Sequence, residues 1–344
     1  MTNFFDETRL AILPHLEKTA QLIAGVLKQL NKRDCACKIT PLEDLGIPNN
    51  VTRMQGGFYT GCLVEWESDI PFVPVDTTVN ACGVSVFELD KKVSVQEFIN
   101  GVNKAKQVFD KTWNFDNGNH FISLCRDKLG ANYLVIHASD NTYKYGKIGL
   151  YPYNEPWYES QIQTFTQGDR YLRYISGQTA SDFYALYKQA EYANPKRNKK
   201  VCEIMFGKNC IKNMLYTAHY GMPTQNSVAI GCQWGSQNLV LLTAPSKDIF
   251  IFKGDKNVNY PHGFGMKLNQ VTSGIEYKKG ELFINGSSVA GKNSFIKSGG
   301  LINRFANETL NGEFLSGFLG EKPFELTKTL SQICAFTRDG FEKY

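Results

Sequence analysis

The spacing of apolar residues predicts helices in two stretches of the first third of the chain. Leucine, isoleucine and alanine recur every three or four positions over residues 6–31, which is the period of one buried helix face. Ser94 and Glu97 then form the pattern of a capping box, which predicts that a second helix begins there. The apolar period over residues 6–31 leads us to expect that residues 1–50 form an N-terminal helical segment.

Runs of β-branched and aromatic residues, separated by glycine, proline and asparagine, predict strands in the rest of the chain. These runs are residues 62–66, 83–89, 120–124, 133–137, 227–231, 239–242 and 249–252, with a hairpin over residues 276–284. Helical spacing returns within residues 180–215, which we expect to form a helical insertion. We expect its basic run 196–200 to lie in a solvated loop rather than against RNA phosphates. The pattern therefore predicts a single α+β domain over residues 1–344, with a β-rich core.

The composition is typical of a well-packed globular protein, with 42% hydrophobic and 13% aromatic residues. The net charge of +5 is a mild basic excess, which is compatible with a polyanionic partner. The nine cysteines are scattered at spacings that suggest no disulfide framework. The first residues lack the pattern of a signal peptide, and no apolar run approaches the roughly 20 residues that span a bilayer. These features predict a cytoplasmic protein without a membrane partner.

Histidine is scarce in this chain, and its positions indicate chemistry rather than packing. There are five histidines, and four of them stand at the ends of predicted strands or in turns that contain glycine. These four are His120, His137, His219 and His262. Cys82 adds a thiol to the set. Neutral imidazole is the commonest protein ligand of transition metals and also serves as a nucleophile or an acid–base group. A set of cysteine and histidine residues of this kind suits zinc or manganese.

These segments also have a purely structural explanation. His120 follows Gly118-Asn119 and begins a predicted strand, and His137 ends another, so both rings would face one cavity if the strands are neighbours. The alternative is that both are buried histidines whose rings only form hydrogen bonds with the backbone. His262 lies in a turn that contains glycine, which makes it a candidate nucleophile, although the glycines could also serve backbone geometry alone.

Taken in order, these segments resemble those of the RtcB family of RNA ligases, over roughly residues 55–340. The matching segments are Cys82-Gly83, Gly118-Asn119-His120-Phe121, His137, His219, Ala244-Pro245-Ser246-Lys247 and His262-Gly263-Phe264-Gly265. Any one segment is a weak signal, whereas the ordered set is fairly specific. The resemblance implies an RtcB-like fold, in which a β-rich core with helical insertions surrounds a central cleft for metal and nucleotide.

Membership of that family would imply a GTP-dependent and manganese-dependent RNA ligase. His262 would attack the α-phosphate of GTP and pass GMP to an RNA 3′-phosphate, which can derive from a 2′,3′-cyclic phosphate, and an RNA 5′-hydroxyl would then displace the GMP. The implied ligands of two Mn²⁺ ions are Cys82, His120, His137 and His219. The implied GTP contacts are Asn119, Ser246, Gly263, Gly265 and Arg338. The partner would be RNA with broken ends, such as a tRNA during splicing or repair.

The chain departs from the family pattern at several positions. An aspartate that bridges the metals in the family is replaced by Val79, and Asp76 lies further back. A glutamate, an asparagine and an arginine of the family are replaced by Ser123, Tyr220 and Met266. Loss of a carboxylate weakens a site for hard cations. A second hypothesis is therefore a relative that keeps the metal scaffold but only binds RNA. A third is a metal-dependent phosphoesterase that acts on a cyclic phosphate.

Overall fold

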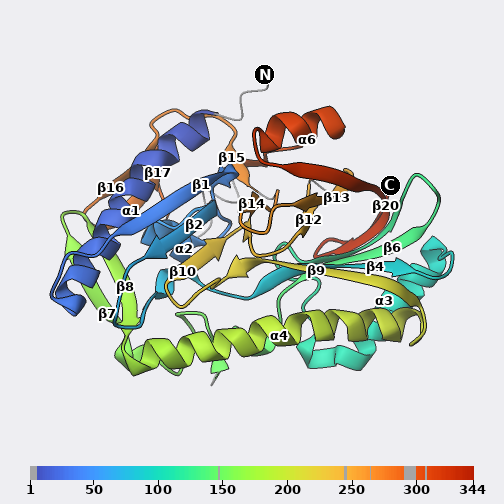
Figure 1. The fold of residues 1–344 in the computed structure, drawn as a ribbon, viewed down its shortest axis with the longest axis horizontal. Helices are drawn as coiled ribbons and strands as arrows, with labels where there is room; N and C mark the ends of the chain where they lie inside the picture. Colours follow the sequence, from blue (N-terminus) through green and yellow to red (C-terminus); the bar gives the residue numbers. More distant parts are fainter. Residues whose placement is uncertain (1–5, 146–147, 244–245, 264, 290–299, 307) are drawn as a thin grey trace.

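The computed structural model describes residues 6–145, 148–243, 246–263, 265–289, 300–306 and 308–344. Among these residues, eleven strands form one antiparallel sheet across the molecule (Figure 1). In spatial order its main path is β1 (Cys37–Gly46), β2 (Thr60–Trp66), β10 (Ser227–Ile230), β9 (Ile211–Gly221), β4 (Cys82–Leu89), β6 (Asn132–Ala138), β5 (Phe121–Arg126), β20 (Phe324–Thr337), β13 (Ile249–Gly254) and β12 (Asn238–Leu241), and β21 (Gly340–Lys343) pairs with β20. The chain is thus of mixed α and β structure with a large antiparallel sheet, which agrees with the predicted α+β class.

Helices lie on both sides of this sheet. They are α1 (Glu7–Asn31), α2 (Val51–Gly56), α3 (Val95–Phe109), α4 (Gln178–Phe206) and α6 (Gly312–Leu319). In Figure 1, α4 runs along one side of the sheet with α3 beside it, and α1 and α6 lie on the opposite side. Within the described residues, no helix has both the length and the apolar character needed to cross a membrane.

The other strands in the described residues form four smaller sheets. They are β3 (Phe72–Pro74) with β8 (Arg170–Ser176) and β7 (Gln163–Gln167), β16 (Ile275–Lys278) with β17 (Glu281–Ile284) and β18 (Ser287–Ser288), β11 (Cys232–Gln233) with β14 (Tyr260–Pro261), and β15 (Met266–Leu268) with β19 (Leu301–Asn303). The β11–β14 pair holds the chain just before His262, whose carbonyl oxygen accepts a hydrogen bond from the Leu242 amide at 2.8 Å.

The central strands are buried because an apolar layer packs on each face. On one face, Phe87 of β4 and Leu134 of β6 pack with side chains of α3 and α4. On the other face, Val84 and Val86 pack with side chains of β12 and β13. Side chains alternate between the two faces of a strand, so Cys82 shares the second face with Val84. The candidate site lies at the end of this second face, near Cys82.

Most of the predicted elements are confirmed. Asp6 caps α1 by accepting a hydrogen bond from the Arg9 amide at 2.8 Å, and Ser94 and Glu97 form the predicted capping box of α3. The predicted strands correspond to β2, β4, β5, β6, β10, β12 and β13, and the predicted hairpin is β16–β17. The sequence pattern did not indicate β20 or α6.

Two predicted helical regions are wrong in part. The N-terminal segment 1–50 is helical only as far as Asn31, and β1 follows it. The insertion 180–215 is helical only as far as Phe206, and β9 begins at Ile211. In both places a neighbouring strand, β2 or β4, supplies hydrogen-bond partners for the backbone. Strand formation depends on such partners more than on the local residues, so local periodicity did not reveal it.

The basic run 196–200 lies inside α4 and not in the loop that was predicted. Two of its side chains turn toward the protein instead of the solvent. The Arg197 guanidinium donates a hydrogen bond to the Asn114 side chain, and the Asn198 amide donates to the Ser85 hydroxyl at 3.0 Å. Both residues are buried, and these contacts favour continuation of the helix through the run.

Candidate functional site

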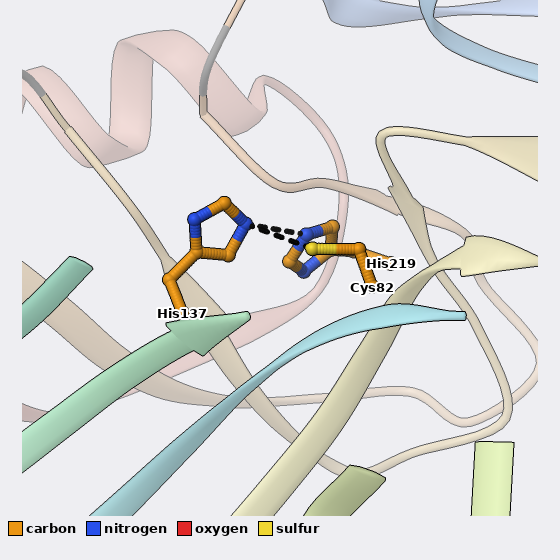
Figure 2. Close-up of side chains that lie close together, drawn as sticks. All are labelled: Cys82, His137 and His219. Carbon is orange, nitrogen blue, oxygen red and sulfur yellow. Dashed lines mark hydrogen bonds between the residues drawn. The ribbon is translucent and has the colours of Figure 1, made fainter. Parts of the chain in front are cut away.

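Three neighbouring strands bring a cysteine and two histidines to one point of the large sheet. β4 lies between β9 and β6, and Cys82 is its first residue. His137 pairs with Val84 near the end of the antiparallel β6, so its side chain shares the face of Cys82. The register between β4 and β9 shifts between Cys82 and Gly83, which leaves His219 as the extra residue of a β-bulge. A bulge redirects a side chain, and the His219 ring points toward the other two (Figure 2).

We call Cys82, His137 and His219 the metal group. The sulfur atom and two ring nitrogens of these residues are arranged so that they could hold a metal ion. Cys82 Sγ lies 3.2 Å from His137 Nε2, which lies 3.1 Å from His219 Nε2 (Figure 2). In a tetrahedral zinc site with bonds of ~2.0–2.3 Å, neighbouring ligand atoms lie about 3.3–3.6 Å apart. The observed spacing is close to this value, and all three side chains are buried. Three protein ligands and one open position are typical of catalytic zinc sites.

Burial keeps both histidines neutral, and a hydrogen bond orients the ring of His137 for metal binding. His137 Nδ1 donates to the carbonyl oxygen of Asn119 at 2.9 Å, which leaves the lone pair on Nε2 within the group. Burial lowers the pKa of His137 to about 3 and holds the pKa of His219 well below its usual value, so both rings are neutral. Burial also raises the pKa of the Cys82 thiol to about 12. Binding of a metal would therefore displace the thiol proton.

His120, the fourth predicted ligand, lines the same cavity but is not part of the metal group. Its Nδ1 donates to the carbonyl oxygen of Asn114 at 2.9 Å. Its Nε2 accepts a hydrogen bond from the Ser139 amide at 3.3 Å and lies 3.2 Å from the Ser139 hydroxyl. The centres of the His120 and His137 rings are 6.0 Å apart. The structure thus brings together three of the four predicted ligands.

His262, the predicted nucleophile, stands beside the metal group with an aspartate behind it. The centre of its ring lies 5.0 Å from that of His219. His262 Nδ1 donates to Asp44 Oδ2 at 2.7 Å, and the same oxygen accepts a hydrogen bond from the Gly263 amide at 2.8 Å. Asp44 lies on β1 and is fully buried. Its carboxylate keeps the ring proton on Nδ1, so the lone pair of the neutral ring lies on Nε2, the nitrogen that would act as nucleophile.

A cavity of about 360 Å³ opens in front of these side chains. The metal group, His120 and His262 all line it. The remaining lining includes two cationic and four aromatic side chains, which are Arg53, Lys144, Tyr145, Tyr151, Tyr153 and Tyr220. None of the described lining residues is an aspartate or a glutamate. A cavity that combines soft metal ligands, a histidine nucleophile and positive charge is suited to a substrate that carries phosphate.

Only part of the predicted GTP contact set reaches this cavity. Asn119 lines it. Ser246 is exposed and is not among the lining residues. Arg338 lies in the turn between β20 and β21, where it is exposed and pairs with Asp339 at 3.4 Å. Residues 244–245 of the matching loop lie outside the described residues.

The glycines of the His262 segment serve backbone packing. Gly263 has a φ of +105°, and a Cβ at this position would lie 1.7 Å from the carbonyl oxygen of Leu242. A Cβ at Gly265 would lie 1.9 Å from the carbonyl oxygen of Asp44. Neither glycine lines the cavity, which favours the structural explanation of these two residues. The intervening Phe264 lies outside the described residues.

The positions that depart from the RtcB pattern explain why the cavity lacks a carboxylate. Val79 is buried in the core. Asp76 is also buried, but its carboxylate accepts hydrogen bonds from Arg173 Nε at 3.0 and 3.2 Å and does not line the cavity. The Ser123 hydroxyl donates to Gln332 Oε1 at 3.0 Å. These residues are engaged in packing or in hydrogen bonds away from the cavity.

Three charged residues of the site were missed in the sequence. Asp44 lies in segment 1–50, for which the sequence pattern predicts helix, and is 218 positions from its partner His262. Arg53 lies on the short helix α2, and Lys144 follows the 3-10 helix Asn141–Tyr143. The chain contains 38 lysines and arginines and 33 aspartates and glutamates, and no local motif distinguishes these three. Only the folded arrangement identifies them.

No family model matches the sequence, and a search of curated proteins finds no significant match. Function is therefore inferred from the residues of the site and their geometry.

Proposed function

We propose that the chain is an RNA ligase that joins a 3′-phosphate end to a 5′-hydroxyl end through a nucleotide bound covalently to His262. One observation carries this proposal. His262 is held by the buried Asp44 carboxylate and lies in one cavity with the Cys82, His137 and His219 metal group. A phosphate bound in this cavity would face a nucleophile, a metal and cationic side chains together. Nucleotidyl transfer needs these three components.

His262 and Asp44 carry the covalent step of the proposal. The lone pair of His262 Nε2 attacks the α-phosphorus of GTP, a P–N bond forms, and the bond to the β-phosphate oxygen breaks to release pyrophosphate. The ring becomes more positive as the P–N bond forms. The Asp44 carboxylate, which accepts the Nδ1 proton at 2.7 Å, stabilises this charge.

The later steps return the histidine to its starting state. An oxygen of the RNA 3′-phosphate attacks the phosphorus of the adduct, the P–N bond breaks, and its electron pair returns to His262 Nε2. The 5′-hydroxyl oxygen then attacks the activated 3′-phosphorus and expels GMP, and the hydroxyl proton passes to solvent. This sequence forms one phosphodiester bond for each GTP that is converted to GMP and pyrophosphate.

The donor set of the metal group fits a single transition-metal ion. A metal held by Cys82, His137 and His219 would neutralise phosphate charge and orient the attacked phosphorus. Thiolate and imidazole suit zinc, whereas manganese prefers sites with carboxylate or water oxygens. His120 is bonded to Ser139, and none of the described lining residues supplies a carboxylate. We therefore propose one metal ion, and an ion softer than Mn²⁺ fits these ligands best.

The RtcB-like identity of the fold is part of the same proposal. The resemblance rests on six segments, and four of them bring Cys82, His137, His219 and His262 to one cavity. His120 of a fifth segment lines it as well, whereas Ser246 of the sixth does not. Unrelated buried histidines would have no reason to converge in this way. The convergence supports the resemblance at four positions and leaves GTP and the RNA ends as the expected substrates.

The adduct is tested directly with labelled nucleotide. The protein is loaded with Zn²⁺ or with Mn²⁺, incubated with α-³²P-GTP or α-³²P-ATP, and separated on a denaturing gel. We expect a labelled band that is acid-labile and alkali-stable, and that is lost in His262→Ala. His15→Ala is the matched control, because His15 is also buried but does not line the cavity.

A labelled band of equal strength in His262→Ala would exclude this nucleophile. If metal-loaded protein forms no band with either nucleotide but still binds RNA ends, the chain acts as a binding protein. The lack of a carboxylate among the described lining residues favours that second candidate.

A further inference from the structure

Two cationic side chains, Arg53 and Lys144, line the cavity that contains the metal group; we call them the cationic wall. Neither side chain has a role in holding the metal ion or in the attack by His262. Arg53 comes from α2 and Lys144 from the loop after β6, so separate parts of the chain place two positive charges beside one cavity. Like charges repel, so such an arrangement is costly unless a negative ligand binds between them.

Lys144 is buried to an unusual degree for a lysine, with 7% of its surface exposed. Its ammonium has no ion pair with a carboxylate in the described part of the chain. Burial lowers its pKa to about 8, and the positive charges of Arg197 and Arg53 also lower it. A buried cation without an anionic partner is destabilising. An anionic ligand would offset this cost.

Arg53 is fixed by two contacts that leave the end of its guanidinium available. Its Nε donates to the Thr78 hydroxyl at 2.7 Å, and its Cζ lies 4.1 Å above the centre of the Tyr220 ring. Among the described residues, neither terminal nitrogen donates to a protein acceptor or pairs with a carboxylate. An arginine that is held in this way presents two parallel N–H groups, which match the oxygens of a phosphate.

Three tyrosines lie beside the cationic wall. The ring centres of Tyr145, Tyr151 and Tyr153 lie 5.1 to 6.0 Å from one another, and all three line the cavity. Tyr151 is buried, whereas 37% of the Tyr145 surface is exposed. Aromatic rings at the edge of a basic cavity bind unpaired bases by stacking. The arrangement fits a single-stranded end, with its phosphate inside the cavity and its last base against tyrosine.

We propose that Arg53 and Lys144 form a subsite for the terminal phosphate monoester of single-stranded RNA, and that Tyr145 stacks on the terminal base. The assignment of this phosphate to the 3′ end rests on the proposed ligase function. The phosphate of such an end carries close to two negative charges, which matches two cations. A 3′-hydroxyl end offers no such charge, so the subsite would distinguish the two ends.

Binding is measured by fluorescence anisotropy with a 5′-labelled single-stranded RNA that ends either in a 3′-phosphate or in a 3′-hydroxyl. We expect the metal-loaded wild-type protein to bind the 3′-phosphate RNA at least ~10-fold more tightly, since one charge-assisted hydrogen bond contributes this much. Arg53→Met and Lys144→Met should reduce the ratio toward one. Arg53→Lys should retain part of the preference.

Two controls separate binding from folding and from general charge. Lys128→Met removes an exposed lysine that does not line the cavity and should leave the ratio unchanged. The melting temperature of each variant shows whether it is folded. His262→Ala should keep the preference for the 3′-phosphate although it forms no nucleotide adduct, so failure of the ligase proposal and failure of this proposal are distinguishable.

Two results would overturn the proposal. The first is equal binding of the two RNA ends by wild-type protein. The second is a preference for the 3′-phosphate end that survives in folded Arg53→Met and Lys144→Met, in particular if these variants lose GTP binding. That outcome would assign the cationic wall to the nucleotide triphosphate and not to the RNA end.

Discussion

The metal group and the cationic wall line the same cavity but are built in different ways. Cys82, His137 and His219 stand at the ends of three adjacent strands, and burial keeps the two imidazoles neutral. Arg53 stands on a short helix and is half-buried, and Lys144 stands in a loop and is buried, and both bring positive charge to the cavity. One region presents lone pairs, which bind a cation, and the other presents N–H groups, which bind an anion.

The two regions are therefore suited to ligands of opposite charge. Neutral donors 3.1 to 3.2 Å apart are satisfied by a metal ion, and two neighbouring cations are satisfied by a phosphate. Among the described residues, no carboxylate lines the cavity to pair with these two cations. A phosphate bound between a metal and the cationic wall would satisfy both regions at once, close to His262.

The largest effect is expected from Cys82→Ser. Loss of the thiolate should reduce metal affinity by more than about 100-fold, because even the loss of an outer hydrogen-bond partner of a metal ligand costs about 10–100-fold. Metal content per chain, measured after dialysis against buffered Zn²⁺ or Mn²⁺, checks this. His120→Ala is the control and should keep its metal. If it loses as much metal as Cys82→Ser, His120 is a ligand and the three-residue metal group is incomplete.

The next effect concerns the residue behind the nucleophile. Asp44→Asn should slow formation of the nucleotide adduct by about 10–100-fold, because a hydrogen bond to a charged group contributes ~1.5–3 kcal/mol and the ring gains charge as the adduct forms. Metal content should not change, because Asp44 bonds to His262 and not to the metal group. The initial rate of ³²P labelling measures the effect. Glu43→Gln is the matched control, since Glu43 pairs with Lys322 instead.

A smaller effect is expected in the salt dependence of RNA binding. Each phosphate contact contributes a slope of about 0.7 in a plot of log affinity against log salt concentration for single strands. Arg53→Met should reduce the slope for the 3′-phosphate RNA by about this amount, whereas Cys82→Ser should leave it nearly unchanged. An equal reduction in both variants would mean that the two regions do not bind RNA independently.

The smallest expected effect is a pH dependence of stability that arises from His15, which lies in neither region. His15 in α1 is buried, its Nε2 lies 2.7 Å from the carbonyl oxygen of Ile275, and burial lowers its pKa to about 4. The unfolded chain, in which this pKa is about 6.5, binds more protons between these values. The stability of the metal-free protein should therefore fall as pH decreases from about 6.5 to 4. Melting temperatures of wild type and His15→Gln test this, and identical pH curves would contradict it.

Local pattern in the sequence predicted much of the frame of this protein. The helix period over residues 6–31, the capping box at Ser94 and the β-branched runs of β4 and β6 are properties of neighbouring residues, so they could be identified without the fold. β1 and β9 were missed in whole or in part, because a strand next to a helix gains its backbone partners only from distant strands.

The chemical character of the metal group follows from local sequence, since rare histidines and a cysteine at predicted strand ends can be recognised before the fold is known. Which of these residues meet depends on how the strands pair. The register of β4 with its neighbours, with a bulge at His219, brought Cys82, His137 and His219 together and left His120 bonded to Ser139. Asp44, Arg53 and Lys144 joined the site through contacts between distant segments. Their roles depend on burial and on the charges around them, which local sequence does not encode.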